Sequence, residues 1–344
     1  MKLCENEGCK QFATNKIIPT YDDIPSDMQG PVSEVCNNHI LDCINPFDLD
    51  SFAIESTAKE NVPDHISVSQ IRLWQQCPWK YTHAYINPEK HTRSEAAIQR
   101  FGIYLHEVLE IYGRQVLLIK SACGNWEEHD IVKNPFETLE KLWMYVWKKN
   151  IRKDPTDLPY SYWENGIKAI RYIAKYIDRF IRVHSVEEQF FFDLHNLPGI
   201  FGFIDRVDIW DEGNKLEIID YKMGKPKKAV WVKKDIQLQV YVKVQSDLHD
   251  ISVEDIIATL EFPTYNQRVS VRFTEDEIEQ TLRRIESIAD NILAARKVYK
   301  DSNGTDYPRT IKGPLCDYCE HLTGICPAWN KEPKKKKYEQ PKLF

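Results

Sequence analysis

Apolar residues recur at two different periods along this chain, and the two periods predict a mixture of helices and strands. Spacings of three and four residues predict helices at 67–86, 94–120, 135–150, 161–184, 233–248 and 274–299. Short runs of β-branched and aromatic residues predict strands at 187–194, 200–210, 215–222, 255–263 and 267–273. The alternation of both kinds of element indicates an α/β chain.

Two of the predicted helices carry aromatic stripes at helical spacing, namely Trp143, Tyr145 and Trp147, and Tyr172, Tyr176 and Phe180. Such a stripe can be a platform on which nucleic-acid bases stack. It can also be the buried face of a helix, and this is the interpretation that we prefer. We therefore expect these aromatic side chains to lie in the core.

The strands predicted at 200–210 and 215–222 flank a polar stretch, Asp211–Asn214, and this pattern is typical of a hairpin. If the turn is centred between Glu212 and Gly213, Asp205 lies opposite Asp220. Two carboxylates about 5 Å apart repel each other by about 3 kcal/mol at an effective dielectric constant of about 20. The hairpin tolerates this pair most easily if a cation lies between the two side chains.

Lys222 lies two residues after Asp220, so its side chain leaves the same face of the strand. A divalent metal held by carboxylates beside a lysine is suited to cleaving phosphodiesters. The alternative is a surface salt bridge on an ordinary hairpin. The same register pairs Asp208 with Glu217 on the opposite face, and there we expect Asp208 to be structural and neutralised by Arg206.

Four segments together resemble the RecB-like branch of the PD-(D/E)XK nucleases. Gly202–Asp208 and Ile218–Lys222 resemble the two catalytic strands of that branch. Gly102–Glu110 resembles its upstream helix with a metal-binding histidine, and Gln237–Tyr241 resembles its Gln-x-x-x-Tyr helix. The resemblance implies a restriction-endonuclease-like core, a mixed central sheet flanked by helices, with a helical insertion.

The resemblance also implies a set of metal ligands. Asp205 and Asp220 would hold Mg²⁺ or Mn²⁺ with His106 and the carbonyl of Tyr221. Glu110 shares a helix face with His106 and is a weaker candidate. A nitrogen ligand favours Mn²⁺ somewhat over Mg²⁺, which prefers oxygen. Whether one or two metals act is left open.

The remaining catalytic roles come from the same resemblance. Lys222 would orient the attacking water or stabilise the transition state. Gln237 and Tyr241, four residues apart on one helix, would position Lys222 and the DNA backbone.

Nine cysteines in a protein expected to be cytoplasmic indicate metal binding rather than disulfides. Cys77, Cys316, Cys319 and Cys326 form a candidate four-sulfur site, and their spacing fits zinc and an iron–sulfur cluster equally. The resemblance to AddB-type and CRISPR-adaptation nucleases implies a [4Fe–4S] cluster that staples the two ends of the domain. Cys123 is expected to be a packing residue.

The first 45 residues predict a small zinc module. Its four expected ligands form two close pairs, Cys4 with Cys9 and Cys36 with His39, and Cys43 could substitute for one of them. A segment this short buries little apolar surface without such a staple. We expect a linker at 46–64, the nuclease domain at 65–330 and a basic, disordered tail at 331–344.

Composition and charge exclude some classes of protein. A net charge of −6 gives no overall nucleic-acid signature, so DNA binding requires local basic patches. The sequence has no stretch of 18 apolar residues and no apolar signal region after Met1, which favours a cytoplasmic protein. It also has no phosphate-binding Gly-x4-Gly-Lys-Ser/Thr motif, so a helicase that opens strands would have to act in trans.

The last residues carry two further patterns. Lys334–Lys337 is a run of four lysines, which is typical of a solvated tail and allows weak phosphate contacts. Gln340–Phe344 resembles the pentapeptide that binds bacterial sliding clamps. If it does so, deleting residues 338–344 abolishes clamp pull-down.

These patterns together predict a metal-dependent deoxyribonuclease. The resemblance implies an exonuclease that acts on single-stranded DNA or DNA ends in replication, recombination or repair. A virus can be the source of such an enzyme. One alternative is a CRISPR-adaptation nuclease. Another, from a different class, is a scaffold subunit that binds DNA ends without cleaving them, which the presence of Asp205, Asp220 and Lys222 disfavours.

Overall fold

The computed structural model describes residues 65–86, 97–122, 125–153, 158–176, 182–194, 197–210, 215–319 and 326–328, together with the backbone of two short strands, β1 (Asn15–Lys16) and β2 (Glu34–Val35), which pair antiparallel. The chain forms two compact units. The first contains Ser94–Phe190 and Gly202–Glu279, and the second contains Pro63–Arg93, Phe191–Phe201 and Gln280–Phe344.

The first unit is built on a mixed sheet. Its strands are β4 (Val183–Leu194), β5 (Leu197–Trp210), β6 (Lys215–Tyr221), β7 (Ile256–Phe262) and β8 (Gln267–Val271). The end of β4 and the start of β5 belong to the second unit. The order β5-β6-β7-β8 joins one parallel pair, β6 with β7, to two antiparallel pairs, and β4 pairs with β5. The expected mixed sheet is confirmed.

The register of the β5–β6 hairpin agrees with the prediction from its turn. The ladder pairs Arg206 with Ile219 and continues to Trp210 with Lys215, and Asp208 lies opposite Glu217 as expected. The ladder ends at the pair Arg206–Ile219, one position before Asp205 and Asp220, so their predicted pairing stays a prediction. The turn residues 211–214 lie outside the described part of the chain.

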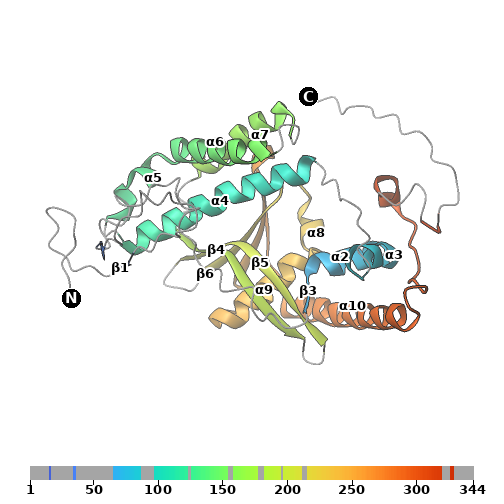
Figure 1. Ribbon diagram of the computed structural model, residues 1–344. Coiled ribbons are helices and arrows are strands. Elements are labelled where there is room, and N and C mark those ends of the chain that lie inside the picture. Colours follow the sequence, from blue (N-terminus) through green and yellow to red (C-terminus); the bar gives the residue numbers. More distant parts are fainter. Residues whose placement is uncertain are drawn as a thin grey trace. The chain divides into compact units, whose positions relative to one another are not determined.

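Helices α4 (Ala97–Ala122), α6 (Pro135–Lys153) and α7 (Tyr160–Lys175) run side by side in the first unit (Figure 1), with short turns η3 (Trp126–Glu128) and α5 (Asp130–Lys133) between α4 and α6. Their apolar stripes meet in one core that also includes Ile219 and Tyr221 of β6. Trp143 is buried there, and a Cβ atom at Gly166 would come within 2.1 Å of its ring, so α6 and α7 approach closely. Of the two aromatic stripes, Trp143 and Tyr172 are buried in this core, and Tyr145, Trp147 and Tyr176 are partly buried and pack against it.

Helix α9 (Ile236–His249) contacts β6 and β7 through buried side chains such as Leu238 and Val242. The side chain of Asp235 caps its start by accepting the amide of Gln237, and Asp250 ends it in the left-handed conformation with φ of 54°. The cap fixes the first turn of α9, and this turn carries Gln237.

Asp208 and Arg206 form a buried ion pair on β5. Both guanidinium contacts are 2.6 Å long, so the pairing is bidentate, and Arg206 Nη1 also donates to the Tyr221 hydroxyl at 3.4 Å. The expectation that Arg206 neutralises Asp208 is confirmed.

The second unit starts with β3 (His65–Ile66), which pairs parallel with the start of β5. The predicted helix 67–86 is broken into α2 (Val68–Gln76), α3 (Pro78–Tyr81) and a π-helical turn, η2 (Thr82–Ile86). The side chain of Ser67 caps α2 by accepting the amide of Gln70 at 3.2 Å. The break at Cys77 follows from Pro78, which disfavours helical geometry in the residue before it and suits the first position of a new helix.

Contacts within the second unit connect α2 and α3 to the C-terminal part of α10 (Glu275–Asp301). Arg296 donates to Gln70 at 3.2 Å and to the Tyr81 hydroxyl at 3.0 Å. The ring of His83 stacks on that of Tyr307, with centroids 5.0 Å apart. These contacts hold the segment around Cys77 near the one that leads to η6 (Pro314–Tyr318).

One predicted element was wrong in extent. The helix expected at 161–184 ends at Lys175, and β4 begins at Val183, four residues before the expected strand. The β-branched Val183 and Val186 are buried in β4, so strand packing outweighs the helical spacing of the aromatic residues before them. The helix expected from 233 is preceded by a separate turn, α8 (Ala229–Val232), and a turn, η5 (Pro263–Tyr265), joins β7 to β8.

Several predictions concern residues outside the described part of the chain. They are the zinc ligands Cys4, Cys9, Cys36 and His39 with Cys43, the linker 46–64, Cys123, Phe180 and the tail 331–344. Among the described residues, no helix combines the length and the apolar character needed to cross a membrane.

Candidate functional site

The candidate site lies at the end of the β5–β6 ladder. The backbone N–H of Tyr221 donates to Asp205 Oδ2 at 2.7 Å, which fixes the Asp205 carboxylate beside the last residues of β6. Asp205 and Asp220 directly follow the last pair of the ladder, Arg206 with Ile219, on their respective strands.

His106 of α4 reaches the same point. Its Nε2 atom lies 3.0 Å from the carbonyl oxygen of Tyr221, and its Nδ1 atom lies 3.7 Å from Asp205 Oδ2. Three of the four predicted metal ligands, His106, Asp205 and the Tyr221 carbonyl, are thus brought together, and their roles remain predictions.

Glu187 of β4 joins these residues and was not predicted. One ligand atom each from His106, Glu187 and Asp205 lies within 4.8 Å of the others. Glu187 has φ of 46°, which non-glycine residues rarely adopt and which costs of order 1–3 kcal/mol. A visible signal was the acidic pair Glu187–Glu188 at the start of an apolar strand, but no pattern predicts the backbone conformation that places Glu187 in the site.

The acidic groups of the site repel one another. Burial, then the charge of Asp220, raises the pKa of Asp205 to about 6, although His106, Lys222 and the Tyr221 amide act in the opposite direction. Burial, then the charges of Asp205 and Glu110, raises the pKa of Glu187 to about 7. A cation placed among these carboxyls would relieve the repulsion.

Asp220 and Lys222 form a second half of the site. The Lys222 ammonium lies 2.5 Å from Asp220 Oδ2, and the side chain of Asp220 is 2% exposed. Lys222 also donates to Gln237 Oε1 at 3.4 Å. Asp220 therefore contacts Lys222 and acts on Asp205 through its charge, and it is not a member of the three-residue ligand group.

A chain of hydrogen bonds fixes the Gln237 amide. Its Nε2 donates to the Tyr241 hydroxyl at 2.5 Å, and that hydroxyl donates to the carbonyl of Phe203 at 2.6 Å. Because Nε2 is committed to Tyr241, Oε1 faces Lys222. Helix α9 is thus coupled to both β5 and the catalytic lysine candidate.

The donor set fits a divalent metal ion. One imidazole nitrogen, carboxylate oxygens and a backbone carbonyl are ligands that Mn²⁺ accepts, and the oxygens suit Mg²⁺. Asp220 Oδ2 is buried and has the Lys222 ammonium beside it, without a hydrogen bond of normal geometry among the described residues. Glu110 is instead paired with Arg114 at 2.8 Å on the same helix.

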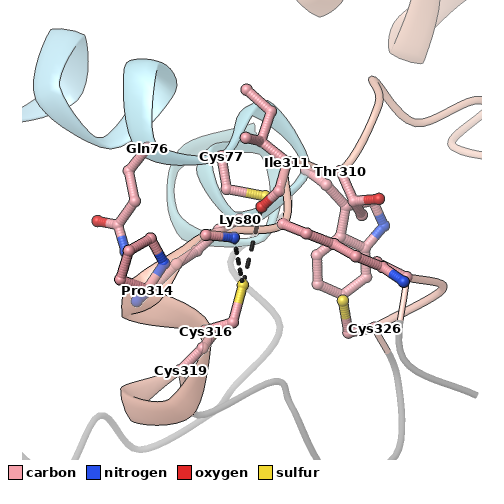
Figure 2. A pocket seen from close by; sticks show the side chains of 13 residues that line it. Gln76, Cys77, Lys80, Thr310, Ile311, Pro314, Cys316, Cys319 and Cys326 are labelled. Carbon is pink, nitrogen blue, oxygen red and sulfur yellow. Dashed lines mark hydrogen bonds between the residues drawn. The ribbon is translucent and has the colours of Figure 1, made fainter.

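The four predicted cysteines of the second unit surround one cavity. Cys77, Cys316, Cys319 and Cys326 all line a space of about 370 Å³ (Figure 2). All four thiols are free and half-buried. The break in the helix at Pro78 brings Cys77 to this wall, and the turn η6 carries Cys316.

The cavity is suited to a negatively charged thiolate cluster. The backbone N–H of Gly313 donates to Cys316 Sγ at 3.3 Å, and Lys80 and Lys312 are among the lining residues. Backbone N–H donors and nearby cations stabilise thiolate ligands.

Comparisons with known proteins show which proteins this chain is similar to. The family model of the PD-(D/E)XK nuclease superfamily matches residues 65–327. A solved structure described as "Putative exonuclease" from Eubacterium rectale is 13% identical, with a TM-score of 0.45, and the match covers 79% of this chain and 90% of that one. The protein SSO0001 is 16% identical, with a TM-score of 0.30, over 65% of this chain and 84% of that one. Among curated proteins, none matches this chain.

The family model covers most of the chain and includes every element that builds the candidate site, from α4 to α9. The chain belongs to the PD-(D/E)XK nuclease superfamily.

Proposed function

We propose that this protein is a metal-dependent deoxyribonuclease that hydrolyses phosphodiester bonds, acting as an exonuclease on single-stranded DNA or DNA ends. The observation that carries the proposal is the convergence of His106, Asp205, Glu187 and the Tyr221 carbonyl on one point, beside the Asp220–Lys222 pair. Structural ion pairs also form on strands, but they do not require three ligand types around a cluster of mutually repelling carboxyls.

In this proposal His106, Asp205, Asp220, Glu187 and the Tyr221 carbonyl hold Mg²⁺ or Mn²⁺. A bound divalent ion lowers the pKa of water and neutralises the charge that develops on the phosphate. The strained backbone of Glu187 is explained if the residue is held in place for this purpose.

Lys222 acts next to the reacting phosphate. In hydrolysis a water oxygen bonds to phosphorus while the P–O bond to the leaving group breaks, so the water loses a proton and the leaving oxygen gains one. The ammonium of Lys222 stabilises the negative charge on the phosphate oxygens during this exchange. Gln237 and Tyr241 hold Lys222 in place through the hydrogen bonds described above.

The cysteine cavity is proposed to hold a [4Fe–4S] cluster. Four thiols around one space and an N–H donor to Cys316 support a thiolate-held metal centre, and the resemblance to AddB-type and CRISPR-adaptation nucleases favours a cluster over a single zinc ion. Its role would be structural, because it links Cys77 to a group of cysteines more than two hundred residues later in the chain.

The pathway and partners are proposed by analogy with the family. Replication, recombination or repair are the proposed settings, with a helicase acting in trans, and a CRISPR-adaptation nuclease is the second candidate. The N-terminal zinc module and the clamp-binding tail at Gln340–Phe344 belong to the same proposal, and they lie outside the described residues.

End-labelled single- and double-stranded DNA, incubated with Mg²⁺ or Mn²⁺, tests the function. Wild-type protein should release short labelled products, and Asp220→Ala should not. Asp247→Ala is the matched control, because Asp247 lies on the exposed side of α9 and pairs with Lys243. Absence of cleavage by the wild-type protein under every condition would favour a scaffold that binds DNA ends.

A further inference from the structure

The segment Met223–Asp235, here called the lysine segment, connects two parts of the candidate site. It begins directly after Lys222 and ends at the cap of α9, two residues before Gln237. The structure describes all of it, including the short helix α8. The segment therefore runs from the proposed catalytic lysine to the helix that carries Gln237.

The lysine segment is strongly basic in an acidic protein. Its thirteen residues contain five lysines and one carboxylate, whereas the chain as a whole carries a net charge of −6. Lys233 pairs with Glu277 at 2.9 Å, and Lys227 lies 3.7 Å from Asp235. Lys225 and Lys228 are exposed and make no ion pair with any described residue.

An exposed aromatic side chain lies among these lysines. Trp231 is 60% exposed and its neighbour Val230 is 58% exposed, although both are large apolar residues. Lys234 Nζ lies 5.1 Å from the centre of the indole ring of Trp231. Val230 and Trp231 thus form an exposed apolar pair, and the lysines around it favour an anionic partner.

The segment is anchored on both sides of Trp231. The backbone N–H of Lys222 donates to the carbonyl of Glu261 at 2.8 Å, and Val232 is fully buried. Helix α8 contacts β8, and the Lys233–Glu277 pair and the Asp235 cap follow at once. Trp231 is thus held on a supported turn, which reduces the entropy lost when it binds a partner.

We propose that the lysine segment binds the substrate strand: an unstacked base stacks on Trp231, and phosphates on either side of it contact Lys225 and Lys228. This inference rests on the proposed nuclease function and names the form of substrate, a single strand. Bases inside a duplex are stacked on each other and cannot cover the indole, whereas a single strand presents both a free base and its phosphates.

Binding in the absence of metal tests the inference without requiring cleavage. Fluorescence anisotropy in EDTA would compare an oligo-dT of about 20 nucleotides, an oligo-rU of the same length and a blunt duplex. Trp231→Ala should weaken oligo-dT binding by about 5-fold to 100-fold and leave duplex binding unchanged. Trp231→Phe, which keeps an aromatic face, should retain most of the affinity.

The contribution of Lys225 and Lys228 is measured separately, by the salt dependence of the affinity. The double variant Lys225→Gln/Lys228→Gln should reduce the slope of log affinity against log salt by about 1.4, whereas Trp231→Ala should leave this slope unchanged. Trp126→Ala is the matched control, because Trp126 also has a lysine, Lys120, over its ring. It follows α4, whose end is about 24 Å along the helix from His106.

The outcomes separate this inference from the proposed function. Wild-type cleavage combined with unchanged single-strand binding by Trp231→Ala overturns the inference and leaves the nuclease intact. An equal loss of duplex binding overturns the stacking contact. Loss of binding in Trp231→Ala, with no cleavage by the wild-type protein, supports the inference and overturns the nuclease. Oligo-dT and oligo-rU both offer free bases and phosphates to Trp231 and the lysines. The ratio of their affinities shows whether the protein prefers a DNA or an RNA strand.

Discussion

At the residue scale, Lys222 is defined by its neighbours. Asp220 holds its ammonium group at 2.5 Å, and Gln237 accepts from it at 3.4 Å, while 31% of its side chain stays exposed. A lysine that served only to neutralise Asp220 would not need a second polar partner that is itself fixed by Tyr241. The arrangement holds the charge in place and leaves it accessible to a substrate.

Replacing Lys222 tests this assignment. Lys222→Met should lower the rate constant for cleavage by about 10²-fold to 10³-fold, because one fixed charge near the reacting phosphate is lost. Binding of Mn²⁺, measured by calorimetry, should remain. Lys243→Met, on an exposed face of α9, serves as the control and should cleave normally. Equal activity of the two variants would remove Lys222 from the mechanism.

The protonation of the site provides a test that needs no substrate. Asp205 and Glu187 have raised pKa values of about 6 and about 7 in the folded protein without metal. Their contribution to stability is therefore present below their ordinary values near 4, and it is lost as the pH rises through about 6 to 7. A divalent ion reverses this preference by favouring the charged carboxylates.

Binding of Mn²⁺ should consequently release roughly one proton per ion near pH 6 and almost none near pH 8. Calorimetry in two buffers with different enthalpies of ionisation measures this number. Glu187→Gln should at least halve the release near pH 6, whereas Glu164→Gln, an exposed change on α7, should not alter it. The same number of protons at both pH values would contradict the role of these carboxyls.

Residues and register were not equally predictable. The pairing of β5 with β6 followed from the position of a polar turn between two apolar runs, because a side-chain period of two leaves few registers that bury the apolar face. Glu187 could not be found in this way, since its place in the site depends on a left-handed backbone conformation. His106 and Gln237 were found through family resemblance, and their spacing alone would not have identified them.

At the element scale, α9 connects β5 to the candidate site. Tyr241 is buried, and its hydroxyl bridges the amide of Gln237 and the carbonyl of Phe203. Sequence patterns located this helix to within a few residues, but they could not show that its tyrosine contacts a strand carbonyl. That contact depends on how the helix lies against the sheet.

Removing the Tyr241 hydroxyl should therefore affect both stability and activity. Tyr241→Phe should lower the free energy of unfolding by about 1–3 kcal/mol, because two buried polar groups lose their partner. Cleavage should also slow, since the Gln237 amide can then rotate away from Lys222. Urea denaturation measures the first effect. Tyr265→Phe, at an exposed position, should change stability by less than about 0.5 kcal/mol.

The break in the helix at Cys77 could also be predicted from the sequence, whereas the contacts of Cys77 could not. Apolar spacing predicted a single helix at 67–86, and Pro78 divided it. The local rule for proline was sufficient to predict the break. The convergence of Cys77 with Cys316, Cys319 and Cys326 required the tertiary structure.

At the scale of the whole molecule, the proposed cluster should connect distant parts of the sequence. Cys77→Ser should abolish absorption in the blue part of the visible spectrum and remove the iron, expected at about four atoms per chain. Gln76→Ala changes a neighbouring residue of the same cavity without removing sulfur, so it should keep the iron. Zinc instead of iron in the wild-type protein, measured by elemental analysis, would contradict the cluster.

The division of the chain between the two units has a consequence for biosynthesis. The second unit combines Pro63–Arg93 with Phe191–Phe201 and Gln280–Phe344, so its segments leave the ribosome far apart in time. The strands and helices around His106 and Lys222 are synthesised before Cys316, and domains generally fold as units while synthesis continues. The nuclease centre can therefore be assembled during translation before the cysteines that would complete the proposed cluster with Cys77 have been synthesised.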